Sequence, residues 1–510
     1  FQAEDGIRDS STSRGLGDVY KRQVHKITKD FLQKLELPVQ EIDPRTIRIF
    51  GRGGQMLPLK LDDRIETLYE NAVIVEGEED GSFDDEDYIL FMAYANDTWN
   101  EESETYLNLY HDTAQYYITY GTSFGKRALV LEGTDSPDAD AVTNAAYTTF
   151  LEEDKHNLGS LGRRWFGQRF FDDQQESFTI ETPNVASGTQ IDVAARVASD
   201  GSETTSFSLT IGNDTNTKSI SGISDSSVGS EPNTSFYQIR GMIHLPQNAA
   251  ESITGKLSYA SNGDLSAIGY LDFIIAQYQR DLDGAGGSFM FSLSSQDAAQ
   301  QLAVASASAE TCIWELGGDV VHMPPAGATI FGSDVIVDED SKFYLSTAYK
   351  TPTYRRSTRV LSPSSFLKDI STLPPTTYLL ITAEAFREEA ELLVSHRKNV
   401  AGLSAKVVIV EEIYKAFSTG QQDIAAIRNF VRYLYFSQGK KLKYLCLFGD
   451  TSYDYKKRTT DNDMVVPTFH ALNSFSLTNS FMSDDFFTCL LYTSDAADDS
   501  LRVDLGGRRI

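Results

Sequence analysis

The spacing of hydrophobic residues changes near residue 377. Before that point, short segments alternate apolar and polar residues and are separated by Gly, Asn, Asp and Ser, which is typical of antiparallel β-strands. After it, short continuous apolar runs alternate with longer segments of helical spacing, which indicates a parallel sheet covered on both faces. The pattern predicts a multidomain chain: β-rich, sandwich-like amino-terminal domains followed by an α/β domain.

The first folded segment, residues 24–124, reads as a β-rich domain. It opens with a short amphipathic stretch, "VHKITKDFLQKLEL". The segment "DPRTIRIFGRGGQMLP" predicts a strand, a tight turn and a second strand. Its "GRGGQ" lacks the spacing of a phosphate-binding loop, and no helix follows it, so a hairpin turn is favoured. "YILFMAY" and "TAQYYITYG" predict two further strands.

Residues 125–372 predict one or more β-sandwich-like regions with long loops. Strands and turns follow each other closely in "FTIETPNVASGTQIDVAARVASDGSETTSFSLTIGN". Residues 213–235 are rich in Ser, Asn, Thr and Gly and read as a long loop, and "SPSSFLKDISTLPPTT" reads as the linker out of the region. In "RRWFGQRFF" we expect four aromatic residues to anchor a core or a domain interface: Trp165, Phe166, Phe170 and Phe171.

The segment 373–488 predicts the first part of an α/β domain. Its apolar runs "TYLLIT", "AKVVIV" and "KYLCLFGD" read as three parallel strands, with helices between them. Gly402 is expected to end the first long helix. Three parallel strands make a sheet that leaves an apolar edge exposed.

The two ends of the chain follow no pattern. Residues 1–23 and 489–510 show neither a helical nor a strand period, and residues 1–23 lack the order of a signal peptide. Both segments resemble translated sequencing-adapter read-through. We therefore leave them out of the fold prediction, and we expect the protein to continue beyond Thr488.

Composition and charge exclude several classes of function. The formal net charge is −28, which repels phosphate backbones and argues against a nucleic-acid partner. No apolar run is long enough to cross a membrane. The three cysteines lie far apart without a CxxC pair, so neither a zinc site nor a disulfide framework is indicated. The acidic run Asp84–Asp87 lacks EF-hand spacing, and a solvated turn is favoured over a calcium loop.

Candidate chemistry gathers where the α/β strands end, because ligand sites in open parallel sheets lie beyond the carboxyl ends of the strands. Asp450 follows the third strand directly, and Asp484 and Asp485 form a second acidic pair. For each of them, a turn-capping or solvated loop acid is the competing interpretation.

No catalytic pair is evident in residues 24–488. Cys446 lies in mid-strand between two leucines, as an inert core thiol would. His470 has no identifiable nucleophile as a partner, and His396 is expected to be exposed on a helix. Neither GxSxG nor HExxH occurs.

Taken in order, "TYLLIT", "FREEAELLVSHRKNVAGLSAKVVIVEEIYKAF", "DIAAIRNFVRYLYF", "LKYLCLFGDTSYDY", "VVPT" and "SDDFF" resemble the opening part of the gingipain-type cysteine peptidase domain. The similarity is greatest to the sortase-like branch that serves type IX secretion in Bacteroidota. Upstream, "DPRTIRIFGRGGQMLP", "DDRIETLYENAVIVEG", "GSFDDEDYILFMAY" and "RRWFGQRF" resemble the amino-terminal β region of that branch. The resemblance runs through nearly all of residues 24–488.

This resemblance implies a caspase-like α/β domain that cleaves peptide bonds with a Cys nucleophile and a His general base. Both residues are expected beyond Thr488, so no catalytic residue is assigned here and the fragment is expected to be inactive. Cys489 lies in the adapter-like tail and is not nominated. Asp450, Asp484 and Asp485 match positions near the substrate cleft.

The implied function is removal of the carboxy-terminal sorting domain from secreted cargo, with transfer of the cargo to lipopolysaccharide. Its partners would be that cargo, other type IX secretion components and the lipopolysaccharide acceptor. The protein would be exported to the outer membrane or cell surface. No cofactor is required; a structural calcium ion is compatible with the sequence but has no assigned position.

Two other functions compete with this one. A β-rich surface or adhesion protein with a ligand-binding α/β domain and no catalysis explains the acidic, turn-rich first part equally well. A receiver-like sheet with Asp450 as phospho-acceptor is weaker, because the neighbouring receiver acids are missing and a long β region precedes it.

Overall fold

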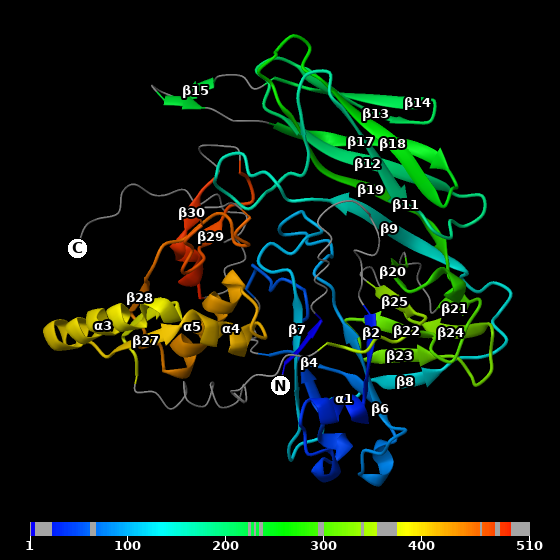
Figure 1. Ribbon diagram of the computed structural model, residues 1–510, viewed down its shortest axis with the longest axis horizontal. Helices are drawn as coiled ribbons and strands as arrows, with labels where there is room; N and C mark the ends of the chain where they lie inside the picture. The colour runs from blue at the N-terminus through cyan, green and yellow to red at the C-terminus, as the bar shows by residue number, and fades with distance from the viewer. Residues whose placement is uncertain are drawn as a thin grey trace.

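The computed structural model describes residues 2–5, 23–61, 68–222, 226–228, 231–233, 238–293, 300–337, 341–353, 375–458, 462–474 and 480–490. Most of the adapter-like ends, residues 6–22 and 491–510, and most of the expected linker, residues 354–374, lie outside them. Three parts are visible in Figure 1: a small β unit, an extended pair of β layers, and an α/β part at one side. No helix in the described ranges is long and apolar enough to cross a membrane.

The amino-terminal unit packs two small antiparallel sheets, ordered β2-β6-β5 and β1-β7-β3-β4, around one apolar core. Alternation places Ile47, Ile49, Tyr116 and Ile118 inside that core. Its elements are β1 (Gln2–Asp5), β2 (Gln23–Thr28), α1 (Lys29–Lys34), η1 (Val39–Glu41), η2 (Pro44–Thr46), β3 (Arg48–Phe50), β4 (Glu70–Asn71), β5 (Val73–Glu76), η3 (Glu78–Asp80), β6 (Tyr88–Ala93) and β7 (Ala114–Thr119).

The hairpin predicted around Gly51–Gly54 is wrong in its second half. The strand β3 and the turn form, but residues 55–61 are not a strand. They leave the sheet and carry Leu57 into the core of the α/β part instead. The preceding amphipathic stretch forms strand β2 followed by the short helix α1.

The middle of the chain forms the predicted sandwich. A four-stranded sheet, ordered β11-β18-β13-β14, packs on one half of a long sheet ordered β17-β12-β19-β9-β20-β25-β22-β23-β8. Alternate residues of β13 face the core between the layers, as Phe207, Leu209 and Ile211 do.

The strands of this middle region are β8 (Leu129–Glu132), β9 (Asn144–Glu152), β10 (Arg169–Phe170), β11 (Gln175–Glu181), β12 (Gln190–Ser199), β13 (Thr205–Ile211), β14 (Asp214–Ile220), β15 (Ser226–Val228), β16 (Glu231–Asn233), β17 (Gln238–Asn248), β18 (Ser252–Ala260), β19 (Gly269–Asp281), β20 (Phe289–Ser292), β21 (Gln300–Val304), β22 (Cys312–Leu316), β23 (Val320–Met323), β24 (Phe331–Val335) and β25 (Lys342–Ser346), with the 3-10 turn η4 (Gly284–Gly286). The loop predicted over residues 213–235 is wrong where β14 and the paired strands β15 and β16 lie. Because only Ile220 of β14 is buried, its sequence carries no apolar alternation.

The α/β part confirms the predicted order of strands and helices. Strand β26 (Tyr378–Thr382) lies between β27 (Ala405–Ile409) and β28 (Tyr444–Leu447), and all three are parallel. The helices are α3 (Arg387–Ala401), α4 (Val410–Phe417) and α5 (Ile424–Ser437), with η5 (Glu384–Phe386), β29 (Phe469–His470), β30 (Met482–Ser483) and η6 (Asp484–Phe487) completing this part.

Both faces of this sheet are covered, which explains the continuous apolar run in β26. Leu379 and Ile381 pack with α4 and α5, whereas Tyr378 and Leu380 pack with α3. Gly402 ends α3 with φ 63°, as its position in the sequence predicted.

Candidate functional site

The loop after β28 lies at the carboxyl edge of the parallel sheet and begins with Gly449. This residue has φ 136°, and a Cβ atom there would lie 2.4 Å from Cγ1 of Val465. Glycine is therefore required for the chain to turn under Val465. The carbonyl oxygen of the next residue, Asp450, accepts hydrogen bonds from the amides of Val465 (2.8 Å) and Val466 (3.3 Å).

The carboxylate of Asp450 is exposed, and it makes no hydrogen bond or ion pair with any described residue. It therefore does not cap the following turn, whereas the other competing interpretation, a solvated loop acid, agrees with its exposure. Its carboxylate remains available to a ligand at the carboxyl edge of the sheet.

Thr468 joins the Asp450 loop to the second acidic pair. Its amide donates to Oγ1 of Thr451 (3.1 Å), and its own hydroxyl donates to Oδ1 of Asp484 (2.5 Å). The hydroxyl of Tyr455 donates to the Thr468 carbonyl at 2.7 Å. Two segments more than 30 positions apart thus meet at one threonine, a residue that belongs to no recognisable sequence motif.

Asp485 is the third acidic residue at the carboxyl edge of the sheet. Its amide donates to Oγ of Ser483 at 3.2 Å, which caps the short turn η6. Its carboxylate is exposed and has no hydrogen-bond partner among the described residues. The structure therefore ties Asp484 to the Asp450 loop and leaves Asp485 beside it in solvent.

The histidines and cysteines of this part do not meet. His470 is buried, and its Nε2 lies 3.2 Å from the carbonyl oxygen of Ser452. Burial lowers the pKa of His470 to about 4, so the ring is neutral at neutral pH. Cys446 packs in the apolar cluster beneath α3, and His396 is exposed on that helix. In residues 375–458, 462–474 and 480–490 no hydrogen bond joins a histidine to a cysteine.

Residues of the motif "RRWFGQRFF", which belongs to the β-rich part, contact the loops that follow β28. The buried guanidinium of Arg163 donates to the carbonyls of His470 (2.7 Å) and Glu102 (2.6 Å), and to the hydroxyl of Ser103 (3.3 Å). Trp165 stacks on Tyr453 with 5.7 Å between ring centroids. Both residues therefore lie at a domain interface.

An ion pair also joins the β-rich part to the loop after β28. Arg458 pairs with the buried Asp154 at 2.7 Å, and its guanidinium lies 4.6 Å from the ring centre of Trp165. The expectation for the four aromatic residues is confirmed for Trp165 at the interface and for Phe166 and Phe170 in the core. It is wrong for Phe171, which is 57% exposed.

The start of α5 is fixed by a residue that is part of no recognisable motif. Asp423 is buried, and its carboxylate accepts hydrogen bonds from the amides of Ala425 and Leu57, both at 2.8 Å. Burial raises the pKa of Asp423 to about 7. The amide of Leu57 lies 366 positions upstream, so the sequence signals the helix cap but not this partner.

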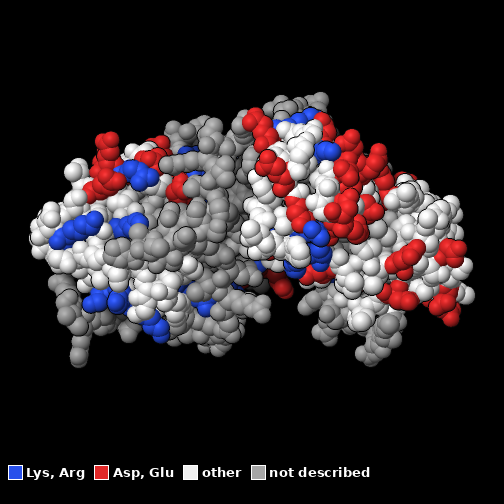
Figure 2. Space-filling view, turned by 90° about the horizontal axis from the view of Figure 1, so that it is seen from below, with Lys and Arg blue, Asp and Glu red and all other residues white. Residues whose placement is uncertain are grey.

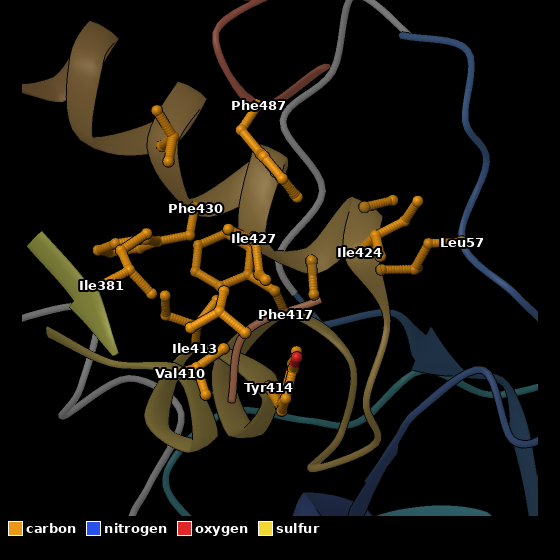
Figure 3. Close-up of a cluster of buried hydrophobic side chains, with 14 of the residues drawn as sticks. Leu57, Ile381, Val410, Ile413, Tyr414, Phe417, Ile424, Ile427, Phe430 and Phe487 are labelled. Atoms are coloured by element: carbon orange, nitrogen blue, oxygen red, sulfur yellow. The ribbon is translucent and has the colours of Figure 1, made fainter. Parts of the chain in front are cut away.

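The same upstream segment contributes to the core around α5. Figure 3 shows Leu57 beside Ile424, in a cluster with Phe417, Ile427 and Phe430. Arg428 on α5 donates hydrogen bonds to the carbonyls of Pro58 (2.9 Å) and Leu59. The α/β part therefore has a core that residues 55–61 complete.

Chemically, the carboxyl edge offers exposed carboxylates on a rigid support. Such groups accept hydrogen bonds from a peptide or pair with a basic side chain. No described group supplies an activated nucleophile beside them. Among the residues that the structure describes, no cluster of three or more His, Cys, Asp or Glu side chains could hold a metal ion.

Parts of the chain match a known protein family and solved structures. Residues 371–506 match the model of peptidase family C25. No curated protein matches the chain significantly. Among solved structures, dimeric latent PorU from Porphyromonas gingivalis superposes with a TM-score of 0.72 at 17% identity, covering 96% of this chain and 46% of that chain. Carbohydrate-binding modules of the CBM36 type also align, with TM-scores of 0.16 and 0.17 over about a quarter of this chain.

Residues 371–506, which include the α/β part, thus match peptidase family C25, the gingipain family, and this match confirms the resemblance found in the sequence. Over 96% of its length the chain shares the fold of PorU, so the described strands and helices form a PorU-like multidomain fold. The chain spans about half the length of the PorU chain that it matches.

Proposed function

We propose that this chain is the amino-terminal part of a PorU-like cysteine endopeptidase. In its full-length form, the enzyme removes the carboxy-terminal sorting signal from type IX secretion cargo and helps to attach that cargo to the cell surface. The observation that carries this proposal is the PorU fold over 96% of the chain, combined with the family C25 match of the α/β part.

The proposed catalytic residues are a Cys nucleophile and a His general base that follow Thr488. The thiolate attacks the scissile carbonyl, backbone amides stabilise the oxyanion, and an amine or water resolves the acyl-enzyme. Two observations support a contribution from outside the described residues. The described histidines and cysteines do not pair, and β28 pairs with β26 along one edge only. A fragment without the missing residues is expected to be inactive.

The carboxyl edge is assigned to the substrate cleft. Asp484 is held by Thr468, and the exposed carboxylates of Asp450 and Asp485 flank it on neighbouring turns. In this role they accept hydrogen bonds from the cargo chain near the scissile bond. The proposed partners are cargo with carboxy-terminal sorting domains, other secretion components and a lipopolysaccharide acceptor. The proposed location is the outer membrane or cell surface.

The test is to sequence the source DNA across and beyond the codons for residues 480–500, and to express both the 510-residue chain and any longer reading frame. Cargo with a sorting domain is then incubated with each protein, and cleavage is followed by mass spectrometry. We expect cleavage by the longer protein, none by the 510-residue chain, and none after Cys→Ala substitution at the new cysteine.

If the source DNA encodes residues 489–510 followed by a stop codon, the peptidase proposal fails for this chain. A β-rich surface protein whose α/β part binds a ligand without catalysis would then be the better description.

A further inference from the structure

The two edges of the parallel sheet carry opposite charge. Residues 375–490 contain 13 Lys and Arg and 13 Asp and Glu, so this part is neutral in a chain of net charge −28. Its acids include the carboxyl-edge residues described above and the glutamates of the first turn of α3. Figure 2 shows that most Asp and Glu side chains on the visible face lie over the other half of the molecule.

Basic residues gather at the amino ends of the three strands, and we call this set the basic amino edge. Hydrogen bonds bring the strand starts together, because the amide of Thr377 donates to the Ser404 carbonyl (2.8 Å) and that of Lys443 donates to the Thr377 carbonyl (3.0 Å). The α3 helix ends at the same edge. The set comprises Arg397, Lys398, Lys406, Lys440, Lys441 and Lys443.

Three of these lysines have no acidic partner. Lys398, Lys441 and Lys443 are exposed, and none forms an ion pair within the described ranges. Other lysines of the chain do have such partners: Lys34 pairs with Asp30 at 2.6 Å and Lys126 pairs with Asp319 at 2.8 Å. An uncompensated group of lysines therefore lies at one end of the sheet.

Apolar side chains stand among the lysines. Val400, in the last turn of α3, is 73% exposed, and Tyr444, the first residue of β28, is 53% exposed. A groove of about 560 Å³ opens between α3 and β27 at this edge, and its lining includes Thr376, Ser395, Ser404, Lys398, Lys406 and one acid, Glu391. Lysines interspersed with exposed aliphatic and aromatic groups suit the boundary between headgroups and acyl chains of a lipid layer.

The acids at the other edge do not cancel this charge. A five-residue strand spans about 17 Å, whereas charges are screened over about 8 Å at physiological ionic strength. A flat anionic surface at the amino edge therefore interacts with the lysines and is screened from the carboxyl edge.

We propose that the basic amino edge binds a lipid surface that carries anionic phosphate headgroups. Lys398, Lys441 and Lys443 contact the phosphates, and Val400 and Tyr444 insert at the headgroup boundary. Binding in this orientation turns the carboxyl edge of the sheet away from the lipid. This inference goes beyond the proposed peptidase and does not depend on it, because it concerns the opposite edge of the sheet.

The test is co-sedimentation of the full 510-residue chain with vesicles of phosphatidylcholine alone, or of phosphatidylcholine with phosphatidylglycerol. The probe variant combines Lys398→Ala, Lys441→Ala and Lys443→Ala. We expect it to bind the anionic vesicles about 100-fold more weakly than the unmodified chain, because each lysine near an anionic surface contributes about a factor of five. Binding by the unmodified chain should disappear at high salt.

The matched control combines Lys218→Ala, Lys256→Ala and Lys342→Ala, which removes the same charge from exposed strand positions of the β-rich part. It should bind as the unmodified chain does. Equal binding to neutral vesicles, or an equal loss in the control, would overturn the proposal. Complete displacement by millimolar inorganic phosphate at constant ionic strength would also overturn it, because that result indicates a single-phosphate site in the groove.

Discussion

At the residue scale, Asp423 links two segments that are remote in sequence. Its carboxylate accepts one hydrogen bond within α5 and one from the amide of Leu57. Both bonds are buried, so removing the carboxylate leaves donors without water or protein acceptors, which is the costly case for a hydrogen bond. A loop aspartate such as Asp450, whose carboxylate binds nothing in the described structure, has no such effect.

The pH dependence of stability reports on Asp423. Burial raises its pKa to about 7 from an ordinary value near 4, so the folded state holds this proton more tightly than the unfolded state does. The stabilisation is complete below about pH 4 and is lost as the pH rises through 7. Between pH 5 and 8, we expect the free energy of unfolding to lose about 3 kcal/mol through this group.

Urea unfolding of the unmodified chain and of Asp423→Asn at four pH values measures this loss. The variant cannot titrate, so its stability should fall less steeply with pH, whatever its absolute stability. Asp450→Asn serves as the control and should follow the unmodified chain. Parallel pH profiles for Asp423→Asn and the unmodified chain would contradict the assignment.

Arg163 gives a second prediction at this scale. Its guanidinium donates to three oxygens, of which the His470 carbonyl lies across the interface in the α/β part and those of Ser103 and Glu102 lie on the β-rich side. Arg163→Met keeps much of the side-chain volume but leaves buried oxygens unpaired, and we expect a loss of about 3 kcal/mol in chemical denaturation. Arg169→Met, at an exposed strand position, should change stability by less than about 0.5 kcal/mol. Similar losses in both variants would show that the interface bonds are unimportant.

At the scale of elements, the end of α3 depends on the backbone of Gly402. Its φ of 63° is strained for other residues, and open space surrounds the position of a Cβ atom. Gly402→Ala should therefore cost about 1 kcal/mol through conformation alone. A Cβ atom at Gly121 would also meet open space, but Gly121 lacks a positive φ. The midpoint of thermal unfolding of Gly121→Ala should therefore equal that of the unmodified chain or be slightly higher.

The elements that were predicted from sequence are those whose signal is local. The three parallel strands, the helices between them and the Gly402 cap follow from apolar runs and helical spacing. Strand β14 was missed because its side chains face solvent, and residues 55–61 because their destination is another part of the molecule. The prediction for residues 55–61 failed because they pack against residues that are far away in the sequence, and not because their own pattern is weak.

The residues of the candidate site also fall into those that local sequence signals predict and those that they do not. Strand ends and a following glycine identify Asp450, and the acidic pair identifies Asp484 and Asp485. Thr468 and Arg163 were not identified, because a threonine in a loop and an arginine beside aromatics have many possible roles. Their contacts become visible only when the loop after β28, the turn η6 and the β-rich side lie together.

At the scale of the whole molecule, the α/β part depends on the β-rich part for its core. Leu57, Leu109 and Tyr110 are buried among residues of α4 and α5. Each buried side chain of this size contributes about 1.5–3 kcal/mol. We predict that residues 375–490 expressed alone lack a cooperative unfolding transition, whereas the full chain has one, as measured by circular dichroism.

A point substitution separates this effect from truncation itself. Leu57→Ala in the full chain should lower the stability of the α/β part by about 3 kcal/mol, because it leaves a cavity beside α5. Leu265→Ala, at an exposed position of the β-rich part, should have no effect. A cooperative transition in the isolated segment, together with a neutral Leu57→Ala, would show that the α/β part folds independently.

The excursion of residues 55–61 also matters for anyone who recombines such proteins. A chimera that exchanges residues 375–490 between two relatives would pair a new α5 with the old Leu57, Pro58 and Leu59, and would bring together surfaces that were never selected as partners. The exchangeable module is discontinuous: residues 55–61 belong with the α/β part although the β-rich region separates them in the gene. Crossover points chosen at the apparent boundary near residue 375 would separate the α/β part from residues that complete its core.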